Sequence, residues 1–187
     1  MKTIAIIGGS SGIGRSLANL EKNTNKVITI QRNASGIIDD NVTEYLVDVL
    51  HGELPDLESL DMLVYCPGSI NLKPFSRLSE EDFKNDYEIN VLGAVRVLQK
   101  YLPLLKKGSN PSVLLFSTVA VKMGMPFHTS IAAAKGAVEG LMKSLAAEYA
   151  PKVRFNAIAP TLTNTRLAEK ILRNDKSKEL SAERHPL

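Results

Sequence analysis

A glycine-rich segment near the amino terminus, residues 8–14, has the composition of a phosphate-binding turn. Glycine permits a tight turn and lets the main chain approach a pyrophosphate closely. The N–H groups at a helix start attract negative charge, and serine hydroxyls add donors. Glycine spacing alone also fits an ordinary strand-to-helix turn, but the position between an apolar run and a helical pattern favours a dinucleotide site. Its candidate residues are Gly8, Ser10, Ser11, Gly12, Ile13 and Gly14.

Six short apolar runs are expected to form the strands that position this turn. The runs are nearly continuous rather than alternating between apolar and polar residues. Strands that are buried on both faces of a parallel sheet have this pattern. The predicted strands are Thr3–Ile7, Lys26–Ile30, Tyr45–Val47, Met62–Tyr65, Ser112–Phe116 and Val153–Ile158.

Helical patterns separate most of these runs. Ser79 and the three acidic residues after it resemble a capping box. The alternation predicts a single α/β domain over residues 1–187, a Rossmann-type doubly wound parallel sheet with helices on both faces. The expected helices are Gly12 to about Glu21, one that starts at Ser79, about Tyr87 to Lys106 with disturbances at Gly93 and Pro103, and about Ser130 to Tyr149.

Two connections lack a helical pattern. Asn33–Glu44 is rich in Gly, Asp and Asn and is predicted to be a loop. His51–Leu60 has room for one short helical turn only. We therefore expect the outer edge of the sheet, around the strand between these connections, to be less fully covered.

Composition gives no reason to expect nucleic acid, a membrane or a metal as partner. The 187 residues carry a formal net charge of +3, and their basic residues are dispersed. Cys66 is the only cysteine, so an internal disulfide and a CxxC zinc pair are both excluded. No segment has the length of a membrane-spanning helix, and the first apolar run is too short for a signal-peptide core. We expect a cytoplasmic protein that acts on a small molecule.

Several motifs, in chain order, resemble the short-chain dehydrogenase/reductase family. Its turn reads T-G-x-x-x-G-x-G, and the glycines at 8, 12 and 14 match, with Ile7 in place of threonine. Asn156–Thr161 is similar to the family's N-A-I-A-P-G, with Thr161 in place of glycine. The resemblance extends to about Thr165 and implies a nicotinamide dinucleotide cofactor. It implies further cofactor contacts at Asp48 and Val49 for the adenine, at Gly68 and Pro160, and at Thr163 and Thr165 for the carboxamide.

The same resemblance implies a partial catalytic set. Family members carry a tyrosine as general acid/base and a lysine one helical turn later that lowers the tyrosine pKa and holds the nicotinamide ribose. A serine fixes the substrate oxygen, and an asparagine carries a water of the proton relay. Asn90 matches the asparagine and Lys135 the lysine, and both also count as cofactor contacts. The serine position falls on Thr118, which keeps a hydroxyl, with Ser117 one place earlier.

The tyrosine position holds Ile131, which has no proton to give. Positioned proton transfer contributes about 100- to 10,000-fold to a rate. Two neighbours are candidate replacements: His128, because imidazole suits proton transfer near neutral pH, and Ser130, which lacks an adjacent base. His128 also fits an exposed loop residue. Two hypotheses follow: a carbonyl reductase or alcohol dehydrogenase with an altered proton donor, and a catalytically weak NADP(H)-binding protein that acts as a regulator, sensor or partner subunit.

The end of the second predicted strand favours NADPH over NADH. NAD sites place an acidic residue here to accept from the ribose 2′-hydroxyl, whereas this chain has Gln31 and Arg32. Arg32 can pair with a 2′-phosphate through its planar fork, with Lys2 and Arg15 as candidate helpers. A solvated loop charge is the alternative interpretation of Arg32.

The resemblance also bears on assembly. The two long predicted helices match those that family members pack across a two-fold axis, which implies a homodimer or homotetramer. Family members normally continue past the last residue of this chain, Leu187, with a further helix and a last strand that this sequence does not contain.

Overall fold

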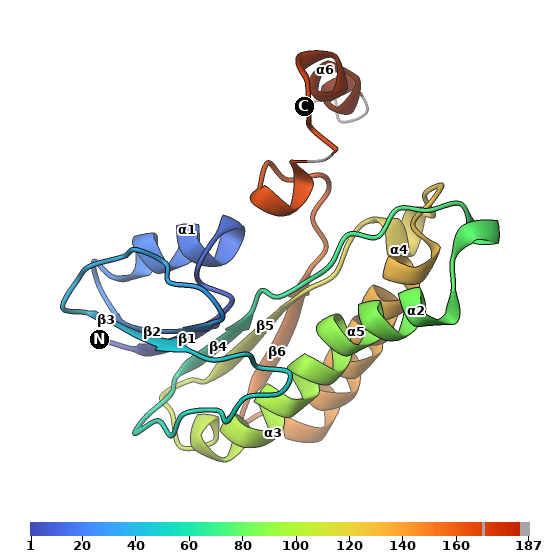
Figure 1. Ribbon diagram of the computed structural model, residues 1–187. Helices are drawn as coiled ribbons and strands as arrows, with labels where there is room; N and C mark the ends of the chain where they lie inside the picture. Colours follow the sequence, from blue (N-terminus) through green and yellow to red (C-terminus); the bar gives the residue numbers. More distant parts are fainter. Residues whose placement is uncertain (170, 184–187) are drawn as a thin grey trace.

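Six parallel strands form the centre of the computed structural model, which describes residues 1–169 and 171–183 (Figure 1). The strand order is β3-β2-β1-β4-β5-β6, so the chain changes direction across the sheet between β1 and β4. Ile7, at the end of β1, pairs with Ile30 on one side and Tyr65 on the other. The carboxyl ends of these strands therefore meet at one edge, where doubly wound folds bind ligands. The strands are β1 (Thr3–Ile7), β2 (Lys26–Gln31), β3 (Val42–Leu46), β4 (Met62–Tyr65), β5 (Ser112–Phe116) and β6 (Arg154–Ile158).

Helices flank the sheet on both faces, as predicted (Figure 1). One face is covered by α1 (Gly12–Glu21), and the other by α3 (Gly93–Leu105) and α5 (Thr129–Tyr149). A distal helix, α6 (Asp175–Glu183), lies away from the sheet. The shorter elements are the 3₁₀ turns η1 (Phe75–Arg77) and η3 (Arg166–Ala168), α2 (Glu80–Tyr87), the π-helix η2 (Glu88–Leu92) and α4 (Ala120–Met123).

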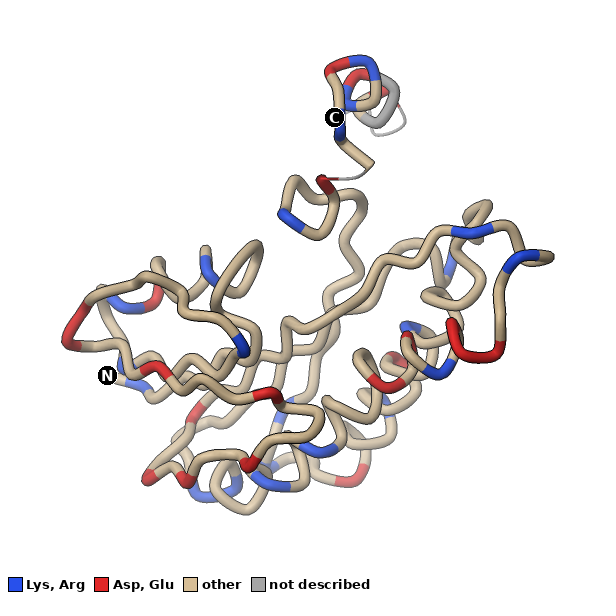
Figure 2. Tube along the Cα trace, viewed as in Figure 1, with Lys and Arg blue, Asp and Glu red and all other residues tan. Residues whose placement is uncertain are grey.

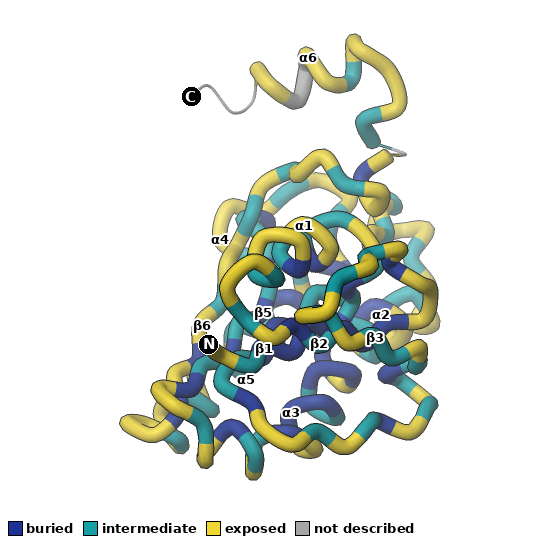
Figure 3. The backbone as a smooth tube through the Cα atoms, turned by 90° about the vertical axis from the view of Figure 1, so that its left-hand side faces the viewer, coloured by how far each residue is buried: buried dark blue, intermediate teal, exposed yellow. Residues whose placement is uncertain are grey.

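Two hydrophobic clusters lie on opposite faces of the sheet, and they follow from the period of two along each strand. The larger cluster joins Ile7 and Leu63 of the strands to Val97 of α3 and Val138 of α5. The smaller one includes Ile6, the strand neighbour of Ile7 that points the other way. Figure 3 shows the buried positions concentrated in the sheet and along α3. Each fully buried aliphatic side chain contributes about 1.5–3 kcal/mol.

The capping box predicted at Ser79 is confirmed. The Ser79 hydroxyl accepts a hydrogen bond from the Asp82 N–H, and the Asp82 carboxylate accepts one from the Ser79 N–H. The disturbance predicted at Gly93 is also found, because the long helix begins with the π-helix η2 and becomes α-helical at Gly93. The Tyr65 hydroxyl donates to the Ile89 carbonyl at 2.7 Å, and a Cβ on Gly93 would collide with this hydroxyl.

The structure differs from the predicted local structure at two places. The loop predicted at Asn33–Glu44 ends earlier, because Val42 pairs with Val27 and starts β3. Helix α4, directly after β5, was not predicted. The expectation of a less covered outer edge is confirmed, since Leu46 on β3 is 60% exposed.

In the part of the chain that the structure describes, neither the distribution of charged residues nor the hydropathy of the helices indicates anything beyond an α/β domain. Basic and acidic residues are interspersed along the trace (Figure 2). Within residues 1–169 and 171–183, no helix combines the length and the apolar character needed to cross a bilayer.

Candidate cofactor site and active site

The backbone of the glycine-rich turn after β1 favours glycine, and Gly8 and Gly14 show the reason. Gly8 has φ of 81°, in the left-handed region that favours glycine, and its N–H donates to the Ile30 carbonyl at 2.8 Å. A Cβ on Gly14 would collide with the Gly8 carbonyl oxygen. The backbone therefore folds closely on itself and leaves the start of α1 open to a ligand.

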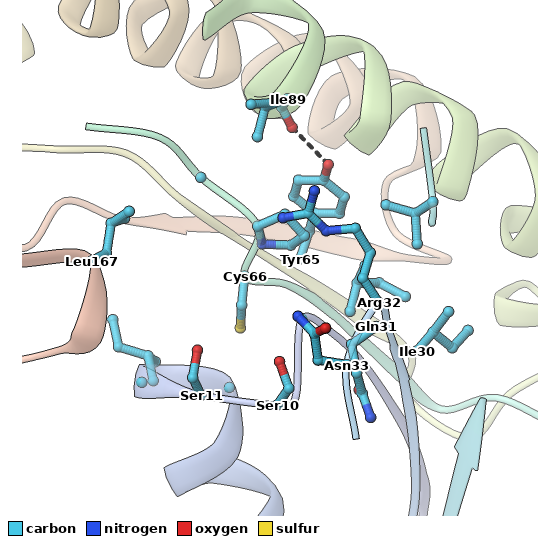
Figure 4. Close-up of a pocket in the computed structure, with 18 of the residues that line it drawn as sticks. Ser10, Ser11, Ile30, Gln31, Arg32, Asn33, Tyr65, Cys66, Ile89 and Leu167 are labelled. Atoms are coloured by element: carbon cyan, nitrogen blue, oxygen red, sulfur yellow. Dashed lines mark hydrogen bonds between the residues drawn. The ribbon is translucent and has the colours of Figure 1, made fainter. Parts of the chain in front are cut away.

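A cleft of about 520 Å³ extends from this turn to the ends of β2 and β3 (Figure 4). Ser10, Ser11, Gln31 and Arg32 lie around it in Figure 4. Eleven residues predicted to contact the cofactor line this first cleft: Gly8, Ser10, Ser11, Gly12, Ile13, Gly14, Arg32, Asp48, Val49, Gly68 and Thr165. Its shape and lining fit a dinucleotide.

Arg32 is exposed at the rim of the first cleft and forms no ion pair with any residue that the structure describes. Gln31 is buried, and its Nε2 donates to Thr29 Oγ1 at 3.1 Å and to the Glu44 carboxylate. The same Glu44 oxygen accepts from the Ser35 N–H at 2.8 Å, which ties the loop after Arg32 to β3. The Arg32 guanidinium is thus free to meet an anion, while Gln31 is engaged within the protein.

The two candidate helpers of Arg32 are misplaced. Lys2 precedes β1, so it lies at the opposite edge of the sheet, where its carbonyl accepts from the Lys26 N–H at 2.9 Å. Arg15 lines neither cleft. The expectation for Lys2 was wrong, because a residue that precedes a parallel strand lies at the amino edge of the sheet, whereas the first cleft lies at the carboxyl ends of the strands.

A second cleft of about 440 Å³ adjoins the first. Its lining is mainly apolar, and Phe127 at its edge has φ of 68°, a strained value for a bulky residue. Thr118, Lys135, Pro160 and Thr163, all predicted site residues, also line it. The two clefts share Ile13, Cys66, Gly68, Thr165 and Leu167.

Lys135 lies at the buried end of the second cleft. Its Nζ donates to the Phe116 carbonyl at 2.8 Å. Burial lowers the pKa of Lys135 to about 8, because desolvation penalises the charged form. A Cβ on Gly68 would lie 3.6 Å from this Nζ and 3.4 Å from Asn90 Oδ1, so both groups border the same glycine.

Asn90 lies behind the cleft wall rather than in it. It is 1% exposed and lines neither cleft. Its Nδ2 donates to Ser69 Oγ at 3.0 Å and to the Asp86 carbonyl at 2.7 Å. Ser69 in turn donates to the buried Asp86 carboxylate. Ser69 and Asp86 were not predicted; their one signal in the sequence is an acidic residue one helical turn before Asn90.

The two hydroxyl residues after β5 differ in their surroundings. Thr118 Oγ1 accepts a weak hydrogen bond from the Ala120 N–H at 3.3 Å and borders the second cleft. Ser117 is buried, and its hydroxyl donates to Glu139 at 2.6 Å. Thr118 is therefore the less committed hydroxyl of the two.

The two candidates for a replacement proton donor, Ser130 and His128, differ in whether they line the second cleft. Ser130 is buried, lines neither cleft and is disfavoured. His128 lines the second cleft, but its Nδ1 is bonded to the Pro126 carbonyl at 2.7 Å. Ile131 lines the same cleft one helical turn before Lys135. In the described part of the chain, no three His, Cys, Asp or Glu side chains gather as a metal site would require.

Comparison with known protein families shows which class of protein has this fold and this site. The family profile described as enoyl-(acyl carrier protein) reductase matches residues 14–187. The chain belongs to the short-chain dehydrogenase/reductase family, whose members are NAD(P)-dependent oxidoreductases.

Individual relatives differ in the reactions that their names give. The chain is 28% identical to the 3-oxoacyl-[acyl-carrier-protein] reductase FabG of Thermotoga maritima, over all of this chain and 83% of that protein. It is 38% identical to the oxidoreductase UcpA of Salmonella typhimurium over 61% of this chain, but spans only 44% of UcpA.

Two solved structures show the same fold. A ligand-free aldohexose dehydrogenase of Thermoplasma acidophilum superposes with a TM-score of 0.84 at 22% identity, over 98% of this chain and 77% of the other. A short-chain dehydrogenase of Escherichia coli CFT073 complexed with NADPH superposes with a TM-score of 0.83 at 23% identity, over 95% and 84%.

Proposed function

We propose that this protein uses NADPH to reduce the carbonyl group of an uncharged, largely apolar small molecule, or NADP⁺ to oxidise the corresponding alcohol. One observation carries the proposal: the first cleft, at the glycine-rich turn, adjoins an apolar cleft whose buried end holds Lys135 and whose wall includes Thr118. Among the residues that the structure describes, His128 is the one basic side chain besides Lys135 in the lining of that second cleft. A substrate with several charges would therefore be desolvated there without partners, at high cost.

The proposed cofactor contacts follow the two clefts. The glycine-rich turn and Ser10 and Ser11 would hold the pyrophosphate, Arg32 the 2′-phosphate, and Asp48 and Val49 the adenine. Gly68, Pro160, Thr163 and Thr165 would border the nicotinamide end, with Lys135 on its ribose. When bound, the cofactor supplies or takes the hydride. The protein's own task is then to orient the substrate oxygen, through Thr118, and to move one proton.

A second function has a specific observation in its favour. Ile131 gives the second cleft an apolar wall at the position where the family resemblance places the acid. A protein that binds NADP(H) but turns over slowly, as a regulator, sensor or partner subunit, would have such a site. We also propose a cytoplasmic location, in which Cys66 stays reduced, and a homodimer or homotetramer formed through α3 and α5.

A fluorescence titration followed by a turnover assay separates the two functions. The chain has no tryptophan, so NADPH emission is measured without indole emission. We expect enhancement on binding, and NADPH oxidation when acetophenone, 2-octanone or cyclohexanone is added. Binding with no oxidation by any uncharged ketone would select the second function, and an absence of binding would contradict both.

A further inference from the structure

Among the described residues, three side chains in the lining of the second cleft carry an ionisable group: Cys66, His128 and Lys135. Carbonyl reduction needs one proton for the substrate oxygen, and Ile131 has none. Burial raises the pKa of Cys66 to about 12, so its thiol holds the proton too tightly to be an effective acid near neutral pH. His128 lies at the start of α5, where its Nδ1 is bonded to the Pro126 carbonyl and its second nitrogen, Nε2, is left as the possible donor. Lys135 is the better-placed acid, because its Nζ borders Gly68, a residue that lines both clefts.

The Lys135 ammonium has N–H donors from which no described residue accepts a hydrogen bond. It carries three N–H donors, and the Phe116 carbonyl accepts one at 2.8 Å. No other hydrogen bond from Nζ is formed within the part of the chain that the structure describes. The neighbouring Asn90 Oδ1 is buried and also without a partner among the described residues. The site therefore presents an acid beside a free acceptor that can orient it.

Asp86 on α2 supplies the opposing charge. Its side chain is 2% exposed, Oδ1 accepts from Ser69, and Oδ2 has no partner among the described residues. A buried carboxylate is costly unless a cation opposes it, and the charge of Asp86 favours the charged form of Lys135. Cys66, the other group that faces Lys135, is an uncharged thiol near pH 8. Glu139, one turn along α5, accepts from Ser117.

We propose that Lys135 itself delivers the proton to the substrate oxygen, and that the buried Asp86 carboxylate is the counter-ion that keeps Lys135 charged. The proposal rests on the function proposed above. In reduction, the carbonyl carbon accepts the hydride that bound NADPH would supply, which would leave NADP⁺, and the π electrons of the carbonyl move to oxygen. One Lys135 N–H bond breaks as its proton joins that oxygen. The neutral amine then regains a proton from solvent, and alcohol oxidation runs in reverse. Asp86 acts through Lys135 and is a positioning residue.

The first test needs neither cofactor nor substrate. NMR of protein labelled with ¹³C at the lysine ε-carbon follows the titration of Lys135, assigned with Lys135→Met. We expect a midpoint at about pH 8 and a shift to lower pH by about one unit in Asp86→Asn, since an opposite charge is lost. Glu81→Gln removes one negative charge from an exposed position of the same helix and should leave the midpoint unchanged. An unchanged midpoint in Asp86→Asn overturns the counter-ion role.

The second test uses turnover of acetophenone with NADPH and of 1-phenylethanol with NADP⁺. Reduction should fall and oxidation should rise as the pH passes about 8, and Asp86→Asn should move both profiles to lower pH. Lys135→Arg keeps the positive charge but cannot release its proton. Its NADPH affinity is measured by fluorescence, and at saturating NADPH we expect it to lose about 100-fold or more in turnover.

The outcomes distinguish this proposal from the proposed function. If wild-type protein turns over and Lys135→Arg retains most of that rate, the proton-donor role is wrong while the enzyme function stands. Loss of turnover in His128→Ala with an intact Lys135→Arg would assign the donor to His128. If wild-type protein binds NADPH and reduces no uncharged ketone, the donor role and the enzyme function fall together. Should Asp86→Asn not fold, the Lys135→Arg comparison still decides the donor role.

Discussion

Ile131 and Lys135 line the same cleft, one helical turn apart on α5. A phenol at position 131 would therefore lie next to the Lys135 ammonium, whose charge favours tyrosinate and lowers a tyrosine pKa. We expect Ile131→Tyr to raise ketone reduction by about 10- to 1,000-fold, which is less than the roughly 100- to 10,000-fold of an evolved general acid because the new phenol is not positioned by its surroundings. The measurement is NADPH oxidation, after folding and NADPH affinity have been checked, because overpacking costs about 1–3 kcal/mol.

Ala132→Tyr is the matched control for that substitution. Ala132 is the next residue on α5 and lines neither cleft. It should leave turnover unchanged. An Ile131→Tyr protein that folds, binds NADPH and gains no activity would show that the second cleft is not arranged for hydride transfer.

Arg32 should determine the preference for NADPH. Arg32→Ala removes a cation at the rim of the first cleft that has no ion-pair partner among the described residues. We expect NADPH binding to weaken by about 1.5–3 kcal/mol, as for other hydrogen bonds to charged groups, and NADH binding to change little. Arg154→Ala, which removes the same charge at the amino end of β6, should affect neither. Equal weakening of both cofactors would contradict the assignment.

Lys135 should make stability depend on pH in a defined window. Its pKa is about 8 in the folded protein and 10.5 ordinarily, because burial disfavours the charge. Between these values the unfolded chain binds a proton that the native state lacks, so the contribution of Lys135 to stability rises with pH. Below pH 8 the full penalty, about 3 kcal/mol, applies. Lys135→Met should therefore be more stable than wild type, and the difference in the free energy of unfolding should be largest at low pH.

Urea unfolding of the two proteins at several pH values measures this difference. Subtracting the wild-type free energy of unfolding from that of Lys135→Met cancels Cys66 and Tyr65, whose pKa values are raised by burial and which titrate in the same range when unfolded. The difference in the free energy of unfolding between Lys135→Met and wild type should decrease from pH 8 to 10.5. A gap that is constant over this window would show that burial does not shift the titration of Lys135.

The sequence predicted much of the frame because the decisive signals are local. The glycine pattern after β1 and the capping box at Ser79 depend on residues a few positions apart, and the structure contains both features where they were expected. The start of β3 was missed because Val42 belongs to a strand only through its pairing with Val27. Pairing across the sheet cannot be seen in a short window.

The same limit applies to the site. Arg32, Thr118 and Lys135 line the clefts where the family resemblance implied. The hydrogen bonds from Asn90 to Ser69 and from Ser69 to Asp86 join separate segments, and no motif announced them. Asp86 in particular lies in a helix rich in charged residues, so the sequence alone indicates an exposed position, whereas the fold buries it. The roles of Asn90, Ser69 and Asp86 in catalysis stay predictions.

Helix α5 offers a test of assembly. Gly140 is exposed, and an added Cβ would meet no atom within 4 Å. We expect Gly140→Arg to fold, with about 0.5–1 kcal/mol gained by removing a glycine from a helix interior, and to break an oligomer formed through this face. Light scattering measures the mass. Asn23→Arg, an equal charge change near the end of α1, should leave the oligomer intact, and a wild-type monomer at micromolar concentration would contradict the prediction.

The π-helix η2 has a consequence for how this chain tolerates change in length. A π-turn holds one residue more than an α-helical turn, so η2 amounts to a single-residue insertion in an otherwise continuous helix. Deleting one residue there would restore regular spacing but rotate everything on one side by about 100°. Either Asn90 would leave Ser69, or the buried stripe of α3 would leave the sheet. Residues 88–92 are therefore fixed in number, and length variation in this protein should be confined to segments outside them.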